Sequence, residues 1–292
     1  MQYAHLGLGT PEYYVPGLPA DYVAERYGIP LADIAKLGSA ENPHGASPLA
    51  TEAVRASLSK LHLYPSWTAD PLREKIAATY GFDTAEVICG AGETEILSLI
   101  TRAFCPPDNK IQMPGPCFPI YHLCAEAEGR TPVLVHDATN RESMGLDVDA
   151  YIEAIEEDTR IVYITNPHSP SGTWLEEKDV RRIIEACPNA LVVLDEAYVH
   201  YSDTPGYIHL ASEYGNLAVL RTFSKAFGLA GLRIGFGIAS KPIIDTLLAV
   251  KPTWNMGQLQ IAGGIAALDD DEHVKQTVET IIENRKYVQG RF

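Results

Sequence analysis

One short segment of this chain brings together an amine, two hydroxyls and a guanidinium. It reads Thr222-Phe223-Ser224-Lys225 and continues through a glycine-rich run to Arg233. The Lys225 amine can form a Schiff base with an aldehyde. The hydroxyls of Thr222 and Ser224 and the planar fork of Arg233 can hold a phosphate. The segment therefore suits a phosphorylated aldehyde, and the competing interpretation is a surface lysine in a turn.

A second candidate is Asp195, which directly follows an apolar run at residues 191–194. A buried carboxylate is costly without a partner, so this position favours a cationic group beside it. The alternative is a helix N-cap before Glu196. Tyr198, three residues further, can share a helical face with Asp195, although such a tyrosine alone is more often a packing residue.

A third candidate is Gly90-Ala91-Gly92, which precedes a helical pattern starting near Glu93. Free amides and the helix dipole make such a helix start favourable for phosphate. A dinucleotide fingerprint is the competing interpretation, but Glu95 stands where its third glycine is required.

The elements that must position these residues alternate between strands and helices. Apolar runs predict seven strands, at residues 86–89, 110–113, 132–135, 161–165, 191–194, 218–220 and 233–238. Helical patterns cover residues 93–104, 148–155, 177–186, 258–268 and 273–290. This order predicts an α/β fold with a mostly parallel seven-stranded sheet and helices on both faces. Polar clusters at residues 90–93, 166–172, 195–198 and 224–225 follow four of the strands, so we expect one site at the carboxyl ends of the sheet.

Composition limits the function classes. The 292 residues allow one large domain, alone or with a small one, and 46% hydrophobic with 21% charged residues is ordinary for a soluble protein. A net charge of −15 argues against nucleic acid or an anionic membrane as the main partner. No signal peptide or membrane helix is expected. The five cysteines match no zinc pattern, and we interpret them as reduced thiols of a cytoplasmic protein with no metal site.

The order of the motifs along the chain resembles histidinol-phosphate aminotransferases, a family of fold type I enzymes that use pyridoxal 5'-phosphate (PLP) among the class I/II aminotransferases. The segments that carry this resemblance are residues 14–19, 42–45, 64–65, 90–92, 166–172, 195–198 and 224–233, so it covers nearly the whole chain. It implies the fold type I large domain, an N-terminal arm over residues 1–40, the PLP-binding domain over 41–250 and a helical start of a small domain over 251–292. The family continues beyond this point with a cap that carries a substrate-binding arginine, so we expect the small domain to be largely absent.

The resemblance also implies roles for individual residues. Lys225 would carry PLP and move the proton, Asp195 would pair with the ring nitrogen, and Tyr198 would bond the ring oxygen. Further cofactor contacts are implied at Ala91, Gly92, Glu93, Phe118, Ser169, Thr222, Ser224 and Arg233. Tyr64 would reach the neighbouring site of a homodimer, and Tyr14 and Asn42 would lie at the substrate.

Three positions depart from the family pattern. Ser169 replaces the usual Asn, Ala40 another Asn, and Leu18 a Lys. They put the ring-oxygen contact and part of the amine recognition in doubt. Transfer of an amino group from an amine or amino acid to a 2-keto acid is the expected reaction. The alternatives are decarboxylation of a phosphorylated amino acid on the same scaffold, or a catalytically idle partner protein.

Overall fold

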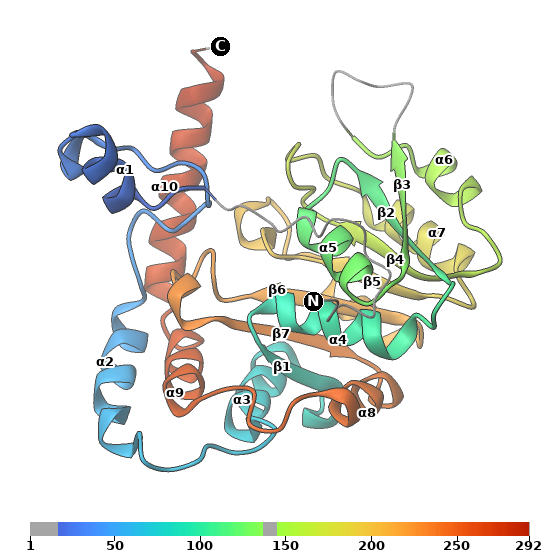
Figure 1. Cartoon of the computed structure of the whole chain (residues 1–292), viewed down its shortest axis with the longest axis horizontal. Coiled ribbons are helices and arrows are strands. Elements are labelled where there is room, and N and C mark those ends of the chain that lie inside the picture. Colours follow the sequence, from blue (N-terminus) through green and yellow to red (C-terminus); the bar gives the residue numbers. More distant parts are fainter. Residues whose placement is uncertain (1–16, 137–144, 292) are drawn as a thin grey trace, which may run out of the picture.

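The sheet of this protein carries helices on both faces (Figure 1). The computed structural model describes residues 17–136 and 145–291. Tyr14, expected at the substrate, lies outside the described residues.

All seven expected strands are present, each within about two residues of its predicted bounds. They are β1 (Val87–Ala91), β2 (Lys110–Gly115), β3 (Thr131–His136), β4 (Thr159–Thr165), β5 (Leu191–Asp195), β6 (Leu217–Thr222) and β7 (Ile234–Ala239). Arg233, predicted as the first residue of the last strand, instead precedes it with a left-handed φ of 54°.

The strand order is β1-β7-β6-β5-β4-β2-β3. Neighbours pair in parallel from β6 to β3, whereas β7 pairs antiparallel with both β1 and β6. Because β7 is inserted in the opposite direction, β1 runs the same way as β4, β5 and β6. Their carboxyl ends therefore share one edge of the sheet, and the prediction of a mostly parallel sheet is confirmed.

The apolar strands are long runs because both of their faces are covered. In β4, Ile161 and Tyr163 belong to one hydrophobic cluster, while Val162 and Ile164 belong to the other. The first cluster includes side chains of α4 (Glu93–Phe104), α5 (Pro119–Ala127) and α8 (Lys241–Val250). The second includes side chains of α3 (Asp70–Tyr80), α6 (Val148–Glu153), α7 (Glu177–Ala186) and α9 (Gln258–Ala267). The prediction of helices on both faces is confirmed.

The remaining α-helices of the described residues are α1 (Ala20–Tyr27), α2 (Pro48–Ser57) and α10 (Asp271–Gln289). Short 3-10 turns lie at other points along the chain. The Ser47 hydroxyl caps α2 by accepting the Ala50 amide, and it donates to Asp270 at 2.6 Å. Helix α2 packs against α9. The division into arm, large domain and partial small domain stays a prediction.

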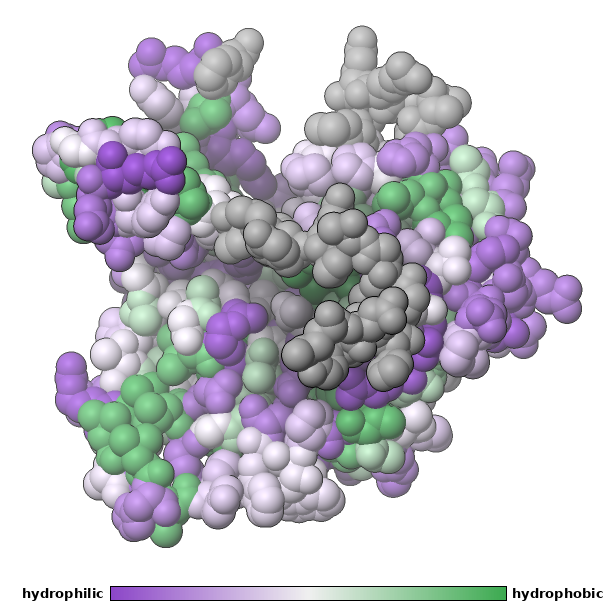
Figure 2. Space-filling model, viewed as in Figure 1, coloured by the Kyte–Doolittle hydropathy of each residue, from purple (hydrophilic) through white to green (hydrophobic). Residues whose placement is uncertain are grey.

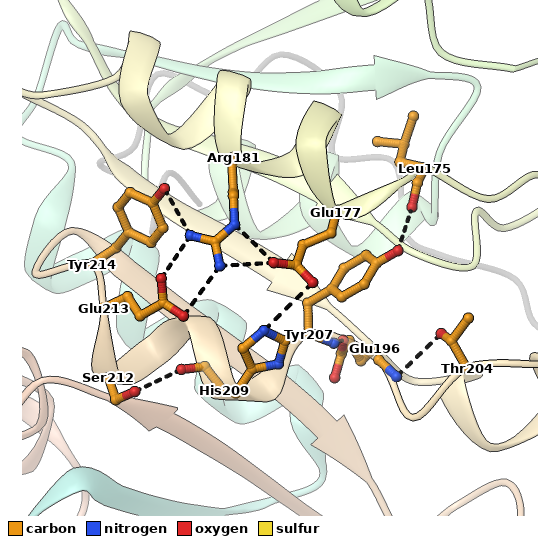
Figure 3. Close-up of polar contacts among 11 residues, drawn as sticks. Leu175, Glu177, Arg181, Glu196, Thr204, Tyr207, His209, Ser212, Glu213 and Tyr214 are labelled. Carbon is orange, nitrogen blue, oxygen red and sulfur yellow. Dashed lines mark hydrogen bonds and ion pairs between the residues drawn. The ribbon is translucent and has the colours of Figure 1, made fainter.

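The connection from β5 to β6 is fastened by a buried ion pair. Arg221 of β6 donates from Nε and Nη2 to Glu196 at 2.9 and 2.7 Å, and both side chains are almost fully buried. Glu196 also accepts the Tyr207 amide (Figure 3). Arg181 of α7 lies between Glu177 and Glu213 on the surface, so the end of this connection is also attached to α7 (Figure 3).

Glu196→Ala should lower the free energy of unfolding by about 3–5 kcal/mol, because it leaves the Arg221 guanidinium buried without its counter-ion. Urea denaturation followed by circular dichroism measures this loss. Asp245→Ala is the control, since it removes only the exposed ion pair with Lys241 and should cost less than about 1 kcal/mol. Equally small losses in the two variants would contradict the structural role of the buried pair.

Candidate functional site

The shared edge of β1, β4, β5 and β6 brings the four polar clusters together as expected. Asp195 ends β5, Lys225 follows β6, and Gly92 follows β1 at the start of α4. Charge links these segments, because Glu93 and Asp195 both raise the pKa of Lys225. The sequence prediction of one site rather than four separate clusters agrees with this geometry.

Asp195 is 3% exposed, and neutral groups hold both of its carboxylate oxygens. Oδ1 accepts the Ala197 amide at 2.9 Å, and Oδ2 accepts the hydroxyl of Tyr121. Burial raises the pKa of Asp195, and the Tyr121 hydrogen bond lowers it. Since neither hydrogen-bonding partner carries a charge, the position suits a ligand cation.

Tyr121 is a functional candidate that the sequence did not indicate. It is fully buried on α5, and its hydroxyl also lies 3.0 Å from Thr165 Oγ1. Its ring stacks on Tyr163 at 4.4 Å and meets the edge of Phe118 at 5.8 Å. Phe118 is thereby placed beside the residue that holds Asp195, which is consistent with its expected position at a ring.

Lys225 lies in a half-buried position next to Tyr198. Its Nζ is 5.2 Å from the centre of the Tyr198 ring and donates to the Ser39 carbonyl at 3.0 Å. Burial lowers the pKa of Lys225, while Glu93, Glu41 and Asp195 raise it. A lowered pKa increases the neutral, nucleophilic fraction of the amine.

The expected helix between Asp195 and Tyr198 is not present. The Asp195 side chain accepts the Ala197 amide, and a short 3-10 turn begins only at Val199. The helical N-cap interpretation of Asp195 is therefore wrong. The local hydrogen bond of the aspartate competes with helix formation.

Thr222, Ser224 and Arg233, the predicted phosphate-binding side chains, lie together at the start of α4, and we call this group the Arg233 cradle. Arg233 Nη1 lies 3.5 Å from Ser224 Oγ, and Thr222 Oγ1 lies 3.0 Å from the same atom. Gly92 has a φ of 80°, and a Cβ there would lie only 2.2 Å from Arg233 Nη2. Glycine is thus required for the guanidinium to reach the helix start. The amide of Ala91 donates to Glu95 Oε2 at 2.6 Å, so it is already engaged within the protein.

The segment around Asn42 is attached to the loop that carries Lys225. Asn42 Nδ2 donates to the Ala226 carbonyl at 3.0 Å and lies 3.2 Å from Thr277 Oγ1 of α10. These contacts give Asn42 a structural role beside its expected substrate contact, which stays a prediction.

The expected contacts of Ser169 and Tyr64 also stay predictions. Ser169 lies half-buried in the loop after β4. The adjacent His168 bridges Ser171 Oγ at 2.7 Å and the Pro116 carbonyl at 2.9 Å. Tyr64 is 79% exposed and packs on Trp254.

The residues present fit PLP. The buried aspartate suits a ring nitrogen, the lysine an aldehyde, and the Arg233 cradle a phosphate. Within residues 17–136 and 145–291, no group of three His, Cys, Asp or Glu side chains is arranged to hold a metal. None of the helices in those ranges has the length and apolar character needed to cross a membrane.

Comparisons with known proteins agree with this geometry. The chain matches the family described as aminotransferase class I and II over residues 32–292. It is 38% identical to a histidinol-phosphate aminotransferase of Anaeromyxobacter sp. (strain Fw109-5), over 97% of this chain and 77% of that protein. It is 40% identical to one from Geobacillus sp. (strain WCH70), over 93% and 73%.

A solved structure of a protein with the same name as these relatives has a similar fold. The crystal structure of histidinol-phosphate aminotransferase from Sinorhizobium meliloti in complex with pyridoxal-5'-phosphate is 26% identical to this chain. It superposes with a TM-score of 0.85 over 94% of this chain and 74% of that one.

Acid should destabilise the protein through His200, which lies edge-on to Phe227 beside the lysine loop. Burial lowers its pKa to about 4, so the unfolded chain binds a proton first and stability falls as the pH drops below about 6.5. His200→Phe should recover about 2–3 kcal/mol of unfolding free energy at pH 4.5 relative to pH 7. Urea titrations at the two pH values measure this difference.

His209→Gln is the matched control, because His209 is about half exposed; this variant should keep the wild-type pH profile. A residual slope in His200→Phe is expected from His168, whose pKa burial also lowers. Identical pH profiles for His200→Phe and the wild type would contradict the assignment.

Proposed function

This chain belongs to the class I and II aminotransferase family, and we propose that histidinol phosphate and a 2-keto acid are its substrate pair. It is a PLP-dependent enzyme that moves an amino group from an amine or amino acid to a 2-keto acid. The relatives named histidinol-phosphate aminotransferase, at 38–40% identity over more than nine-tenths of the chain, support this substrate.

The observation that carries the proposal is the buried Asp195 on the same sheet edge as Lys225 and the Arg233 cradle. Asp195 would face the ring nitrogen, and the Lys225 amine would bond to the aldehyde carbon. Bound PLP supplies an electron sink for the bond broken at the substrate's Cα. Once the substrate amine has replaced it on the aldehyde carbon, the released Lys225 amine would take the proton from Cα and return it to that former aldehyde carbon.

The remaining predicted residues would hold and orient the cofactor. Arg233, Ser224 and Thr222 would hold the phosphate together with the backbone of Gly92 and Glu93. Phe118 would cover one ring face. Tyr198 and Ser169 would lie toward the ring oxygen, where the serine offers a single hydroxyl in place of an amide.

We also propose a homodimer that completes the site. A set of large apolar side chains is exposed on the surface after α2 and beside α9: Leu58, Leu61, Leu63, Tyr64, Trp67 and Trp254. Figure 2 shows hydrophobic residues gathered at the lower left, over the end of α2. An open groove of about 560 Å³ between Leu61, Leu63 and Gln258 also reaches Arg233. An apolar surface of this kind favours a protein partner, and its continuity with the Arg233 cradle supports a shared site.

Purified protein with PLP should form glutamate from L-histidinol phosphate and 2-oxoglutarate. Lys225→Ala should lose the visible absorption band of bound cofactor and at least about a thousandfold of activity, because the covalent bond and the proton carrier are lost together. Absorbance and a coupled glutamate assay measure the two effects. Circular dichroism checks that the variant is folded.

An unchanged visible band in Lys225→Ala would refute the cofactor assignment. If the wild type carries the band but forms no glutamate, the substrate proposal fails. A panel of other amines and a carbon dioxide assay then separates transamination of another substrate from decarboxylation, and a lack of any turnover would favour an idle protein.

Mixing two inactive variants tests the shared site. Tyr64→Ala and Lys225→Ala should each be weakly active alone, whereas a mixture refolded together should be much more active than the sum of both. One site in each mixed dimer would combine an intact Lys225 with the partner subunit's Tyr64. Mixed dimers detected by mass spectrometry without any recovery of activity would contradict the crossing of Tyr64.

A further inference from the structure

Glu93 is a buried acid that the proposed function does not use. The sequence indicated only its backbone amide, yet its side chain is 9% exposed and its Oε1 has no hydrogen-bond partner among the described residues. An unpaired buried oxygen is unfavourable unless a ligand or a proton compensates for it. Glu93 therefore requires an explanation beyond the start of α4.

The backbone of Glu93 is tightly confined. A Cβ on Gly235 of β7 would lie 2.3 Å from the Glu93 amide nitrogen, so the strand lies directly against the start of the helix. The preceding residue, Gly92, is pressed against the Arg233 guanidinium in the same way. The first residue of α4 cannot easily move its side chain away from the sheet edge.

Three groups on three different elements interact electrostatically with the Glu93 carboxyl. They are Asp195 at the end of β5, Lys225 after β6 and Tyr121 of α5. Burial raises the pKa of Glu93 well above its usual value, the charge of Asp195 raises it further, and Lys225 lowers it. Two ionised carboxylates side by side in this buried position would repel each other strongly.

We propose that Glu93 is a positioning residue that stays a neutral carboxylic acid and donates a hydrogen bond to Asp195. This inference rests on the proposed PLP site. The donated hydrogen bond stabilises Asp195 as the carboxylate, and the pair presents one negative charge, rather than two, to the ring nitrogen. A neutral Glu93 also leaves the adjacent Arg233 cradle free of a repelling charge.

The protonation state can be tested without cofactor or activity. At pH 7, the infrared difference spectrum of wild type minus Glu93→Gln should contain the carbonyl band of a protonated carboxylic acid. The spectrum of Asp195→Asn should still contain this band. Glu74→Gln, which alters an exposed acid of α3, should produce no such band. If only ionised carboxylate bands change in Glu93→Gln, or if Asp195→Asn alone removes the band, the proposal is overturned.

Thermal unfolding of the cofactor-free protein supplies a second readout. Because the folded protein would hold the Glu93 proton that the unfolded chain releases above about pH 4.5, the contribution of Glu93 to wild-type stability should fall with rising pH, opposite in sign to that of His200. The melting temperature of Glu93→Gln should therefore rise relative to the wild type between pH 5 and pH 7.5. A difference independent of pH would overturn the proposal.

Cofactor binding then tests the positioning role. The amide of Glu93→Gln can still donate to Asp195, so its Kd for PLP should stay within about threefold of wild type, whereas Glu93→Ala should bind about tenfold more weakly. Tighter binding by Glu93→Gln, by tenfold or more, would indicate an ionised Glu93 and overturn the proposal. Absence of the cofactor band in wild type would instead refute the PLP site. The infrared result would still show whether Glu93 is protonated.

Discussion

The burial of the Asp195 carboxylate is the constraint on which the site depends. A charge held away from water at the end of a central strand is stable only if nearby groups compensate for it. Tyr121 and the Ala197 amide supply hydrogen bonds but no charge. The position of Lys225 and the need for a cationic ligand both follow from this arrangement.

Adjacent acids in the sequence serve different purposes. Asp195 ends β5 and faces the site, whereas Glu196 accepts two hydrogen bonds from Arg221 within the protein. The ion pair and the contacts of Arg181 hold the chain between β5 and β6 against the sheet and α7. These contacts therefore hold the ends of β5 and β6 in place, next to Asp195 and Lys225.

The fold could be predicted from the sequence because strands covered on both faces are continuous apolar runs. The helical periodicity also predicted the observed bounds of α4 and α7. The sequence also predicted that Asp195 and Lys225 lie at the carboxyl ends of two strands, and Asp195 ends β5 while Lys225 follows β6. The contacts of Tyr121 and of the Glu93 side chain could not be predicted from the sequence. Tyr121 reaches Asp195 across 74 residues, and a glutamate at a helix start is usually exposed. Nothing in their neighbouring residues indicates these contacts.

Asn42 joins segments that are very distant in the chain. Its amide contacts Ala226 across 184 residues and Thr277 across 235, while the Lys225 contact with Ser39 spans 186. Contacts of such separation carry the entropy of closing a long loop, and they form after local helices and neighbouring strands. We therefore expect the surroundings of the reactive amine to be completed late in folding, so that a partly folded chain exposes Lys225 to solvent.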